Sequence, residues 1–197
     1  MTEAGAERGS GTAEADASAA EVRALVERAK RGEREAFEDL YLIHFDRIYS
    51  YLQMSVGNKH DAEDLANQTF VKMIESIDRF EWRKVPLSAW LFRIAHNLAM
   101  DHFRSRRRWQ PEEEPPEPPG GAVRSAEDEA FHALGERSLF DLIEGLSEDQ
   151  QQVLTLKFAF DFSNAEVGTI LGKSEGAIKS LQHRALGSLQ RQLANGS

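Results

Sequence analysis

Residues 110–121 divide the chain, because they hold glutamate, proline and glycine but no aliphatic or aromatic side chain that could enter a core. Prolines favour extended backbone, so this stretch predicts a spacer rather than a folded element. Apolar residues recur at helical spacing on both sides of it. We therefore predict an all-α protein of two small helical domains, over residues 20–109 and 126–197, joined by a flexible, acidic, proline-rich linker over residues 110–125. Residues 1–19 show no hydrophobic period and are expected to form a disordered tail.

The N-terminal unit is predicted to contain a pair of helices, a third helix and a long fourth helix. Gly57 and Asn58 end the pair, and Asp61 has the position of a cap for the third helix. The apolar stripe of that third helix comprises Leu65, Phe70, Met73, Ile74 and Ile77. After a loop over residues 78–86, the fourth helix is expected over residues 87–107. Its core side holds Leu87, Trp90, Leu91, Ile94 and Leu98, and its second, mostly polar line holds Arg93, Asn97, Met100, Arg104 and Arg107.

The C-terminal unit carries the pattern of a helix-turn-helix. Ser163 with Glu166, and Ser147 with Gln150, have the spacing of capping boxes, which mark two helix starts. Gly172 can adopt positive φ and bend the chain before Ser174 caps the last helix. The core side of that helix holds Ala177, Ile178, Leu181, Ala185 and Leu189. Its polar side can reach bases or phosphates of a DNA groove and holds Lys179, Ser180, Gln182, His183 and Arg184.

Composition narrows the function classes. The chain of 197 residues has no cysteine, which excludes a thiolate zinc site, and we expect neither a metal nor another cofactor. No apolar run approaches the ~18 residues of a membrane span, and the N-terminus lacks the layout of a signal peptide, so we expect a cytoplasmic protein without membrane insertion. The net charge of −9 opposes DNA binding, although Arg104, Arg106, Arg107 and Arg108 form a basic cluster. We therefore expect weak binding to free DNA and dependence on a partner.

Four segments in order resemble the conserved parts of extracytoplasmic-function (ECF, group 4) sigma factors of bacterial RNA polymerase, within the sigma-70 family. Residues 36–41 resemble the start of the family's first conserved region, and residues 61–72 resemble the helix that docks on the polymerase clamp. Residues 87–101 resemble the promoter-melting helix, and residues 146–154 resemble the start of the C-terminal domain. The resemblance covers roughly residues 21–193 and identifies the two units as sigma region 2 and sigma region 4.

This resemblance implies a promoter-specificity subunit without catalytic residues of its own. Its partners would be core polymerase, through the clamp and flap of the large subunits, promoter DNA and an anti-sigma factor. Recognition and melting of the −10 element would fall to Phe80, Trp82, Arg83, Lys84, Arg93, Asn97, Arg104, Arg107 and Arg108. Recognition of the −35 element would fall to Lys179, Ser180, Gln182, His183 and Arg184. Docking on core polymerase would fall to Asp61, Asp64, Asn67 and Gln68.

The same residues have structural alternatives. Phe80 and Trp82 can close the core over the long helix, and the arginine cluster can favour the negative end of a helix dipole. His183 can be a neutral surface residue, and the polar face of the third helix can meet only water. The acidic linker can be a plain spacer, or it can lie along basic polymerase surface meant for RNA.

Three positions depart from the family's usual pattern. Leu181 stands where many members carry arginine, Gly168 stands where alanine is common, and Gly187 weakens the last helix by up to ~1 kcal/mol relative to alanine. We expect weak contacts with DNA phosphates and an unusual preferred −35 sequence. An operator-binding regulator is the alternative function, and it would bind DNA tightly without polymerase. An enzyme is disfavoured, because no phosphate loop, nucleophile-base arrangement or metal-ligand cluster occurs in the sequence.

Overall fold

The structure is a computed structural model that describes residues 10–82, 85–109 and 145–195, with side chains for residues 19–82, 85–106 and 145–192. Over these residues all regular structure is helical, which confirms the predicted fold class. The first group of elements is α1 (Ser10–Lys30), α2 (Arg34–Val56), α3 (Lys59–Ser76), the 3₁₀ turn η1 (Ile77–Arg79) and α4 (Leu87–Trp109). The second group is α7 (Glu148–Leu154), the π-helical turn η2 (Thr155–Ala159), α8 (Asn164–Leu171) and α9 (Glu175–Asn195).

Helix α1 differs from the predicted tail over residues 10–19, which are helical. This segment alternates alanine with small and acidic residues, and alanine has the most favourable helix propensity. The segment continues into a part of α1 that is held by tertiary packing, where Val26 is fully buried. A helix that is anchored at one end can extend through residues that bury little surface. Residues 1–9 lie outside the described part of the chain.

Helices α2 and α3 form an antiparallel pair around a tight turn. Gly57 ends α2 with φ of 70°, in the left-handed region, and its N–H donates to the Gln53 carbonyl. The cap of α3 is Asn58, whose side chain accepts from the N–H groups of His60 and Asp61 at 2.9 and 3.1 Å. The prediction that Asp61 caps this helix is therefore wrong, because the cap lies three residues earlier, at Asn58, and Asp61 falls in the first turn.

Aromatic rings fill the space between α2 and α3. Tyr41 lies 4.8 Å from Phe70 between ring centroids, and it also stacks on Phe45 at 4.8 Å. Helix α4 closes this core with Leu91, which is fully buried. The long fourth helix was predicted over residues 87–107, and the structure confirms its start at Leu87. Among the described residues, no helix is long and apolar enough to cross a lipid bilayer.

The second unit begins its helices where the capping patterns predicted. Ser163 accepts from the Glu166 N–H at 3.3 Å, and Glu166 accepts in return from the Ser163 N–H at 2.7 Å. Gly172 then adopts φ of 65°, and the Ser174 hydroxyl accepts from the backbone of the first turn of α9. These contacts confirm the helix-turn-helix, which was predicted from local sequence signals alone.

Gly168 is explained by the close approach of the turn after α8. A Cβ at this position would lie 2.7 Å from the Lys173 carbonyl oxygen, closer than side-chain carbons are found to backbone. The Lys173 N–H donates to the Gly168 carbonyl at 2.9 Å, which holds the turn against the helix. The glycine therefore permits a tight turn, and its presence in place of alanine has a packing reason.

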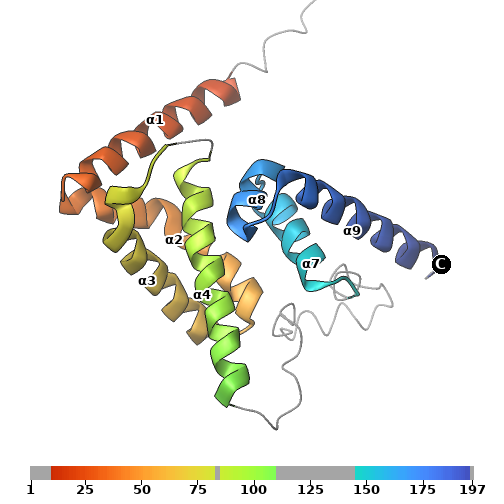
Figure 1. Ribbon diagram of the computed structural model, residues 1–197. Helices are drawn as coiled ribbons and strands as arrows, with labels where there is room; N and C mark the ends of the chain where they lie inside the picture. The colour runs from red at the N-terminus through yellow and green to blue at the C-terminus, as the bar shows by residue number, and fades with distance from the viewer. Residues whose placement is uncertain (1–9, 83–84, 110–144, 196–197) are drawn as a thin grey trace, which may run out of the picture.

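The two units share one hydrophobic core, although the sequence predicted only a tether between them. Helices α1 and α3 lie on one side of α4, and α7, α8 and α9 lie on the other (Figure 1). Phe160 and Phe162 of the second unit pack against Phe92 of α4, with ring centroids 5.1 and 4.8 Å apart. Helix α4 is therefore buried on two sides. The predicted linker over residues 110–125 lies outside the described residues.

Candidate promoter and polymerase interfaces

Helix α4 presents a polar stripe to solvent. Arg93, Asn97 and Arg104 are all exposed, and their spacings of four and seven place them on one face of the helix. Arg104 is paired with Asp101 at 2.8 Å, so one of its donors is engaged on the surface. Met100 lies between them and is half-buried. The structure thus brings three of the predicted −10 residues together in a line of amide and guanidinium groups.

Other predicted −10 residues are not described at side-chain level. Arg83 and Lys84 lie outside the described residues, and Arg107 and Arg108 continue the backbone of α4 without described side chains. Phe80 is described, and its assignment to DNA is wrong for this arrangement, because its side chain is only 4% exposed. Its ring packs 5.0 Å from both Trp82 and Trp90, so it belongs to the core over α4.

Trp82 lies at the edge of that cluster and is half-buried. The guanidinium of Arg23, from α1, sits 5.0 Å from its ring centroid in a cation–π contact. Its indole N–H is buried and has no hydrogen-bond partner among the described residues. Trp82 is therefore held between α1 and the core, and only part of its ring is open to solvent.

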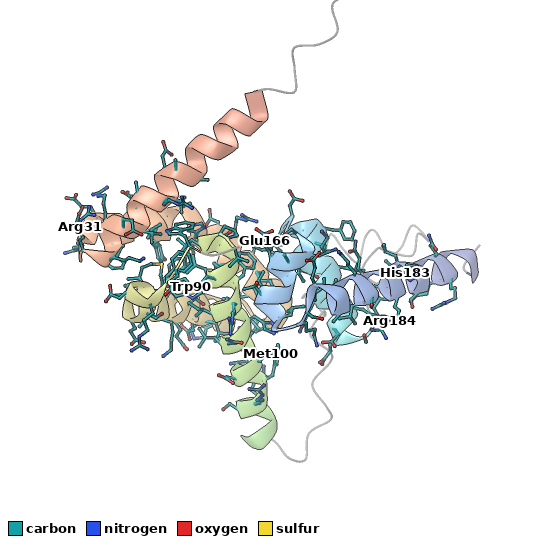
Figure 2. All side chains as sticks on the ribbon, turned by 45° about the horizontal axis from the view of Figure 1, so that its top comes forward. Arg31, Trp90, Met100, Glu166, His183 and Arg184 are labelled. Carbon is teal, nitrogen blue, oxygen red and sulfur yellow. The ribbon has the colours of Figure 1, made fainter. Side chains whose placement is uncertain are left out.

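Helix α9 separates a buried face from a polar one, as the sequence predicted. Ile178, Leu181 and Ala185 are buried. The opposite side carries four exposed residues and one half-buried residue: Lys179, Ser180, His183, Arg184 and, half-buried, Gln182. Figure 2 shows His183 and Arg184 on α9, clear of α4. The predicted −35 residues therefore form one continuous exposed surface on α9, and the buried face of the same helix anchors it to the rest of the unit.

Two of these polar groups are engaged within α9. Lys179 pairs with Glu175 at 2.8 Å, and the Ser180 hydroxyl donates to the Gly176 carbonyl. The hydrogen bond from Lys179 lowers the pKa of Glu175, which keeps this carboxylate ionised next to the candidate DNA surface. The negative charge of Glu175 beside the predicted −35 residues weakens their attraction to DNA phosphates. This agrees with the expected weak binding to free DNA.

Leu181 and Gly187 have different explanations. Leu181 is 8% exposed and packs in the core, so this position faces inward in this chain. The residues that face solvent on α9 are unaffected by it. A Cβ at Gly187 would meet nothing within 4 Å, so packing does not require glycine there.

The predicted docking residues on α3 divide into two groups. Asp64, Asn67 and Gln68 are exposed on the outer face of the helix, and Asp64 pairs with His60 at 3.7 Å. Asp61 instead turns toward the end of α4. One of its carboxylate oxygens lies 3.5 Å from His102 Nε2 and 3.9 Å from Arg106 Nη1. Asp61 therefore balances the basic end of α4 and stands apart from the other three.

An exposed apolar pair on α3 was missed. Val71 and Ile74 are each 53% exposed and lie on the same face as Asn67. The prediction that Ile74 faces the core is wrong, because Phe70, Met73 and Ile77 already complete the buried face of α3. The spacing of four and seven residues from Asn67 was a usable signal, since it places both apolar residues on the same helix face as Asn67.

Comparison with known proteins follows the same division of the chain. Residues 40–109 match the family described as Sigma-70 region 2, and residues 136–189 match Sigma-70, region 4. The chain is 39% identical over 180 residues to the ECF RNA polymerase sigma factor BldN of Streptomyces coelicolor, covering 91% of this chain and 68% of that protein. The chain belongs to the ECF RNA polymerase sigma factors.

Further relatives agree with this family. The RNA polymerase sigma factor CarQ of Myxococcus xanthus is 32% identical, over 85% of this sigma factor and 95% of the relative. Among solved structures, the sigma factor RpoE in complex with the anti-sigma factor NepR, from Bartonella quintana, is 27% identical with a TM-score of 0.62. That match covers 80% of this sigma factor and 96% of the RpoE chain.

The family fixes the general role of the protein. As a sigma factor it directs RNA polymerase to promoters, and core polymerase and promoter DNA are its partners. In this sigma factor the region 2 match contains α3 and α4, and the region 4 match contains α8 and most of α9. The two exposed polar surfaces described above therefore lie in the two matched regions.

Proposed function

We propose that this sigma factor reads the −10 element with the polar stripe of α4 and the −35 element with the polar face of α9. The observation that carries the proposal is the exposure of Asn97 between Arg93 and Arg104 on one face of a helix whose other faces are buried. An amide flanked by two guanidinium groups suits a nucleotide, because the amide can bond a base edge while the cations meet phosphates.

Promoter melting requires at least one base to leave the stack. Unstacking costs a few kcal/mol, which hydrogen bonds to the base edge and contacts to the neighbouring backbone can return. Asn97 supplies the base-edge donor and acceptor, and Arg93 and Arg104 supply phosphate contacts. Phe80 is closed in the core, whereas Trp82 and Trp90 each keep part of the ring open to solvent.

Helix α9 serves the second element in this proposal. Lys179, His183 and Arg184 extend from the N-terminal and central part of a helix that is anchored through Ile178 and Ala185. Such side chains donate to guanine acceptors in the major groove and to phosphates. Gln182 and Ser180 complete the surface with groups that both donate and accept.

Docking on core polymerase would use the outer face of α3. Asp64, Asn67 and Gln68 supply polar contacts there, and Val71 and Ile74 supply apolar area next to them. A polar rim around exposed apolar residues is the usual composition of a protein–protein contact. Through this contact the protein would act in the cytoplasm with the polymerase, without catalysis of its own.

An anti-sigma factor would control the protein. Support comes from the RpoE relative, whose structure holds it together with the anti-sigma factor NepR. The alternative of a free operator-binding regulator is disfavoured by the family and by the net charge of −9.

Transcription in vitro with core polymerase on a promoter library tests the proposal. Asn97→Ala should slow formation of the open complex more than that of the closed complex, whereas Lys179→Ala with Arg184→Ala should remove dependence on the −35 sequence. Gln53→Ala, exposed on α2, is the matched control and should behave as wild type. Equal effects of Asn97→Ala on both complexes would remove the assignment of base capture. Tight operator binding by the protein alone would favour the regulator instead.

A further inference from the structure

Helix α1 reaches the edge of the proposed −10 surface through one arginine. The helix lies outside the region 2 match of residues 40–109, and it packs against η1, at the start of the segment that leads to α4 (Figure 1). Arg23 is exposed on α1, and its guanidinium carbon lies 5.0 Å from the centroid of the Trp82 ring. Arg28 and Lys30, the other basic residues of α1, pair with carboxylates instead.

The position of Arg23 is fixed by the packing of α1. Val26, one turn further along the helix, is fully buried, and Ala29 is 2% exposed. At the end of the helix, Arg28 Nε donates to Glu33 Oε2 at 2.7 Å, which joins α1 to the turn before α2. Because tertiary packing holds the helix in this way, the Arg23 side chain extends from a rigid base toward Trp82.

Packing rather than hydrogen bonding sets the orientation of Trp82, which is half-buried. Its indole N–H is buried and has no hydrogen-bond partner among the described residues. Its ring meets Phe80 at a steep angle, with centroids 5.0 Å apart and planes at 78°. That contact is apolar, whereas a guanidinium attracted to the negative face of an indole adds direction. Arg23 therefore sets which part of the Trp82 ring is covered and which part stays open to solvent.

The aromatic cluster around Trp82 continues into the polar stripe of α4. Phe80 packs 5.0 Å from Trp90 as well as from Trp82. Trp90 precedes Asn97 by seven positions, so the two side chains lie on the same face of α4. A row of contacting rings therefore links Arg23 on α1 to the helix face that carries Asn97.

We propose that Arg23 is a positioning residue for promoter opening, which holds the Trp82 ring so that an unstacked base of the −10 element can stack on its open part. The inference rests on the proposed reading of the −10 element by α4. Stacking on an aromatic ring returns part of the cost of taking a base out of the duplex. A ring that already has its bound orientation loses less conformational freedom at that step. Arg23 thus acts through Trp82, without a DNA contact of its own.

Quenching of tryptophan fluorescence by acrylamide tests the contact in the free protein. The chain has three tryptophans, so Trp90→Phe and Trp109→Phe leave Trp82 as the remaining one. In this background, Arg23→Ala should raise the quenching constant of Trp82, because the ring loses its cover. The matched control is Arg31→Ala, which removes the same charge from the exposed turn after α1 and should leave quenching unchanged. Circular dichroism should show equal helix content in all variants.

Opening of a promoter by the holoenzyme tests the role of the contact, with 2-aminopurine in the −10 element as the probe of base unstacking. Arg23→Ala should slow opening about two- to fivefold, as expected for the loss of one exposed cation–π contact. Trp82→Ala should slow opening at least as much. The double variant should be no slower than Trp82→Ala alone, because Arg23 acts through that ring.

Two outcomes would overturn the inference: additive effects of Arg23→Ala and Trp82→Ala on opening, or equal quenching in Arg23→Ala and the Arg31→Ala control. Arg23→Lys keeps a cation over the ring and should restore part of the opening rate. Failure of the proposed function gives a different result. Opening at the wild-type rate in Asn97→Ala would reject the reading of the −10 element by α4, whereas the quenching of Trp82 does not depend on DNA.

Discussion

The hydroxyl of Tyr51 lies 3.0 Å from Nδ1 of His96, and this contact joins α2 to α4 inside the core. Tyr51 is 2% exposed and His96 is 9% exposed. Burial, and next the charge of Lys173, lowers the pKa of His96, so the ring is neutral near pH 7 and Nδ1 can accept a hydrogen bond from the Tyr51 hydroxyl. A buried polar pair of this kind is stable only while both partners are present.

Tyr51→Phe should therefore destabilise the protein by about 1–3 kcal/mol, because it leaves a buried imidazole nitrogen without its partner. Urea unfolding followed by circular dichroism measures the loss. Tyr49→Phe is the control, since Tyr49 is half-buried and stacks on Phe45, and its effect should stay within ~0.5 kcal/mol. Equal stability of the two variants would show that the contact with His96 contributes nothing.

His44 should make the fold sensitive to acid. Burial, and next the charge of Arg47, lowers its pKa from 6.5 to about 4, and its Nε2 has no hydrogen-bond partner among the described residues. The unfolded chain takes up the proton first, so this contribution to stability is complete above pH 6.5 and is lost as the pH falls toward 4. The loss should approach about 3 kcal/mol at pH 4.

Urea unfolding between pH 4 and pH 8 measures this dependence. His44→Leu should flatten the acid side of the curve, because the replaced side chain binds no proton. His60→Gln changes a histidine whose side chain is 84% exposed and should leave the curve as in wild type. An unchanged acid slope in His44→Leu would assign the sensitivity to other groups.

Gly168 and Gly187 should respond to replacement by alanine in opposite directions. Gly168→Ala forces a carbon to within 2.7 Å of the Lys173 carbonyl and should destabilise by about 1–3 kcal/mol. Gly187→Ala meets open space and should stabilise α9 by up to ~1 kcal/mol. Thermal unfolding of both variants gives the comparison. A stabilising Gly168→Ala would mean that the turn moves freely away from α8.

The apolar pair on α3 should matter for polymerase binding. Ile74→Asp places a charge in the centre of the proposed docking face and should weaken affinity for core polymerase by about tenfold or more. Met54→Asp makes the same chemical change at another exposed apolar site, on α2, and should leave affinity unchanged. Fluorescence anisotropy of the labelled sigma factor with core polymerase measures both. Equal affinities would exclude this face of α3 from the contact.

Local signals predicted local structure well. The Ser163–Glu166 capping box, the left-handed Gly172 and the start of α4 at Leu87 each depend on residues within a few positions, and each is observed. The predictions for single residues were wrong where neighbouring positions on a helix had to be told apart. Ile74 and Asp61 each lie at the border of a buried face, and one residue turns a side chain by about 100° around the helix axis.

The packing between the two units was beyond sequence reasoning. Phe92 and His96 are four residues apart and form a second buried line on α4, beside the predicted core side. The sequence alone does not indicate which element packs against the second apolar line of a helix. Phe160 and Phe162 carry no periodic signal, because a left-handed Asp161 sets their directions. The exposure of Arg93, Asn97 and Arg104 on α4, and of Lys179, His183 and Arg184 on α9, was nevertheless predictable, since exposure follows from the periodicity of a single helix.

The hydrogen bond from Arg47 to residue 160 ends on a main-chain oxygen, so it survives any side chain at that position. The alignment of the two units therefore depends on the backbone at this point, while the Phe160 and Phe162 rings supply the apolar contact with Phe92. Substitutions among aromatic and aliphatic residues at positions 160 and 162 would change how tightly the units pack without changing their register.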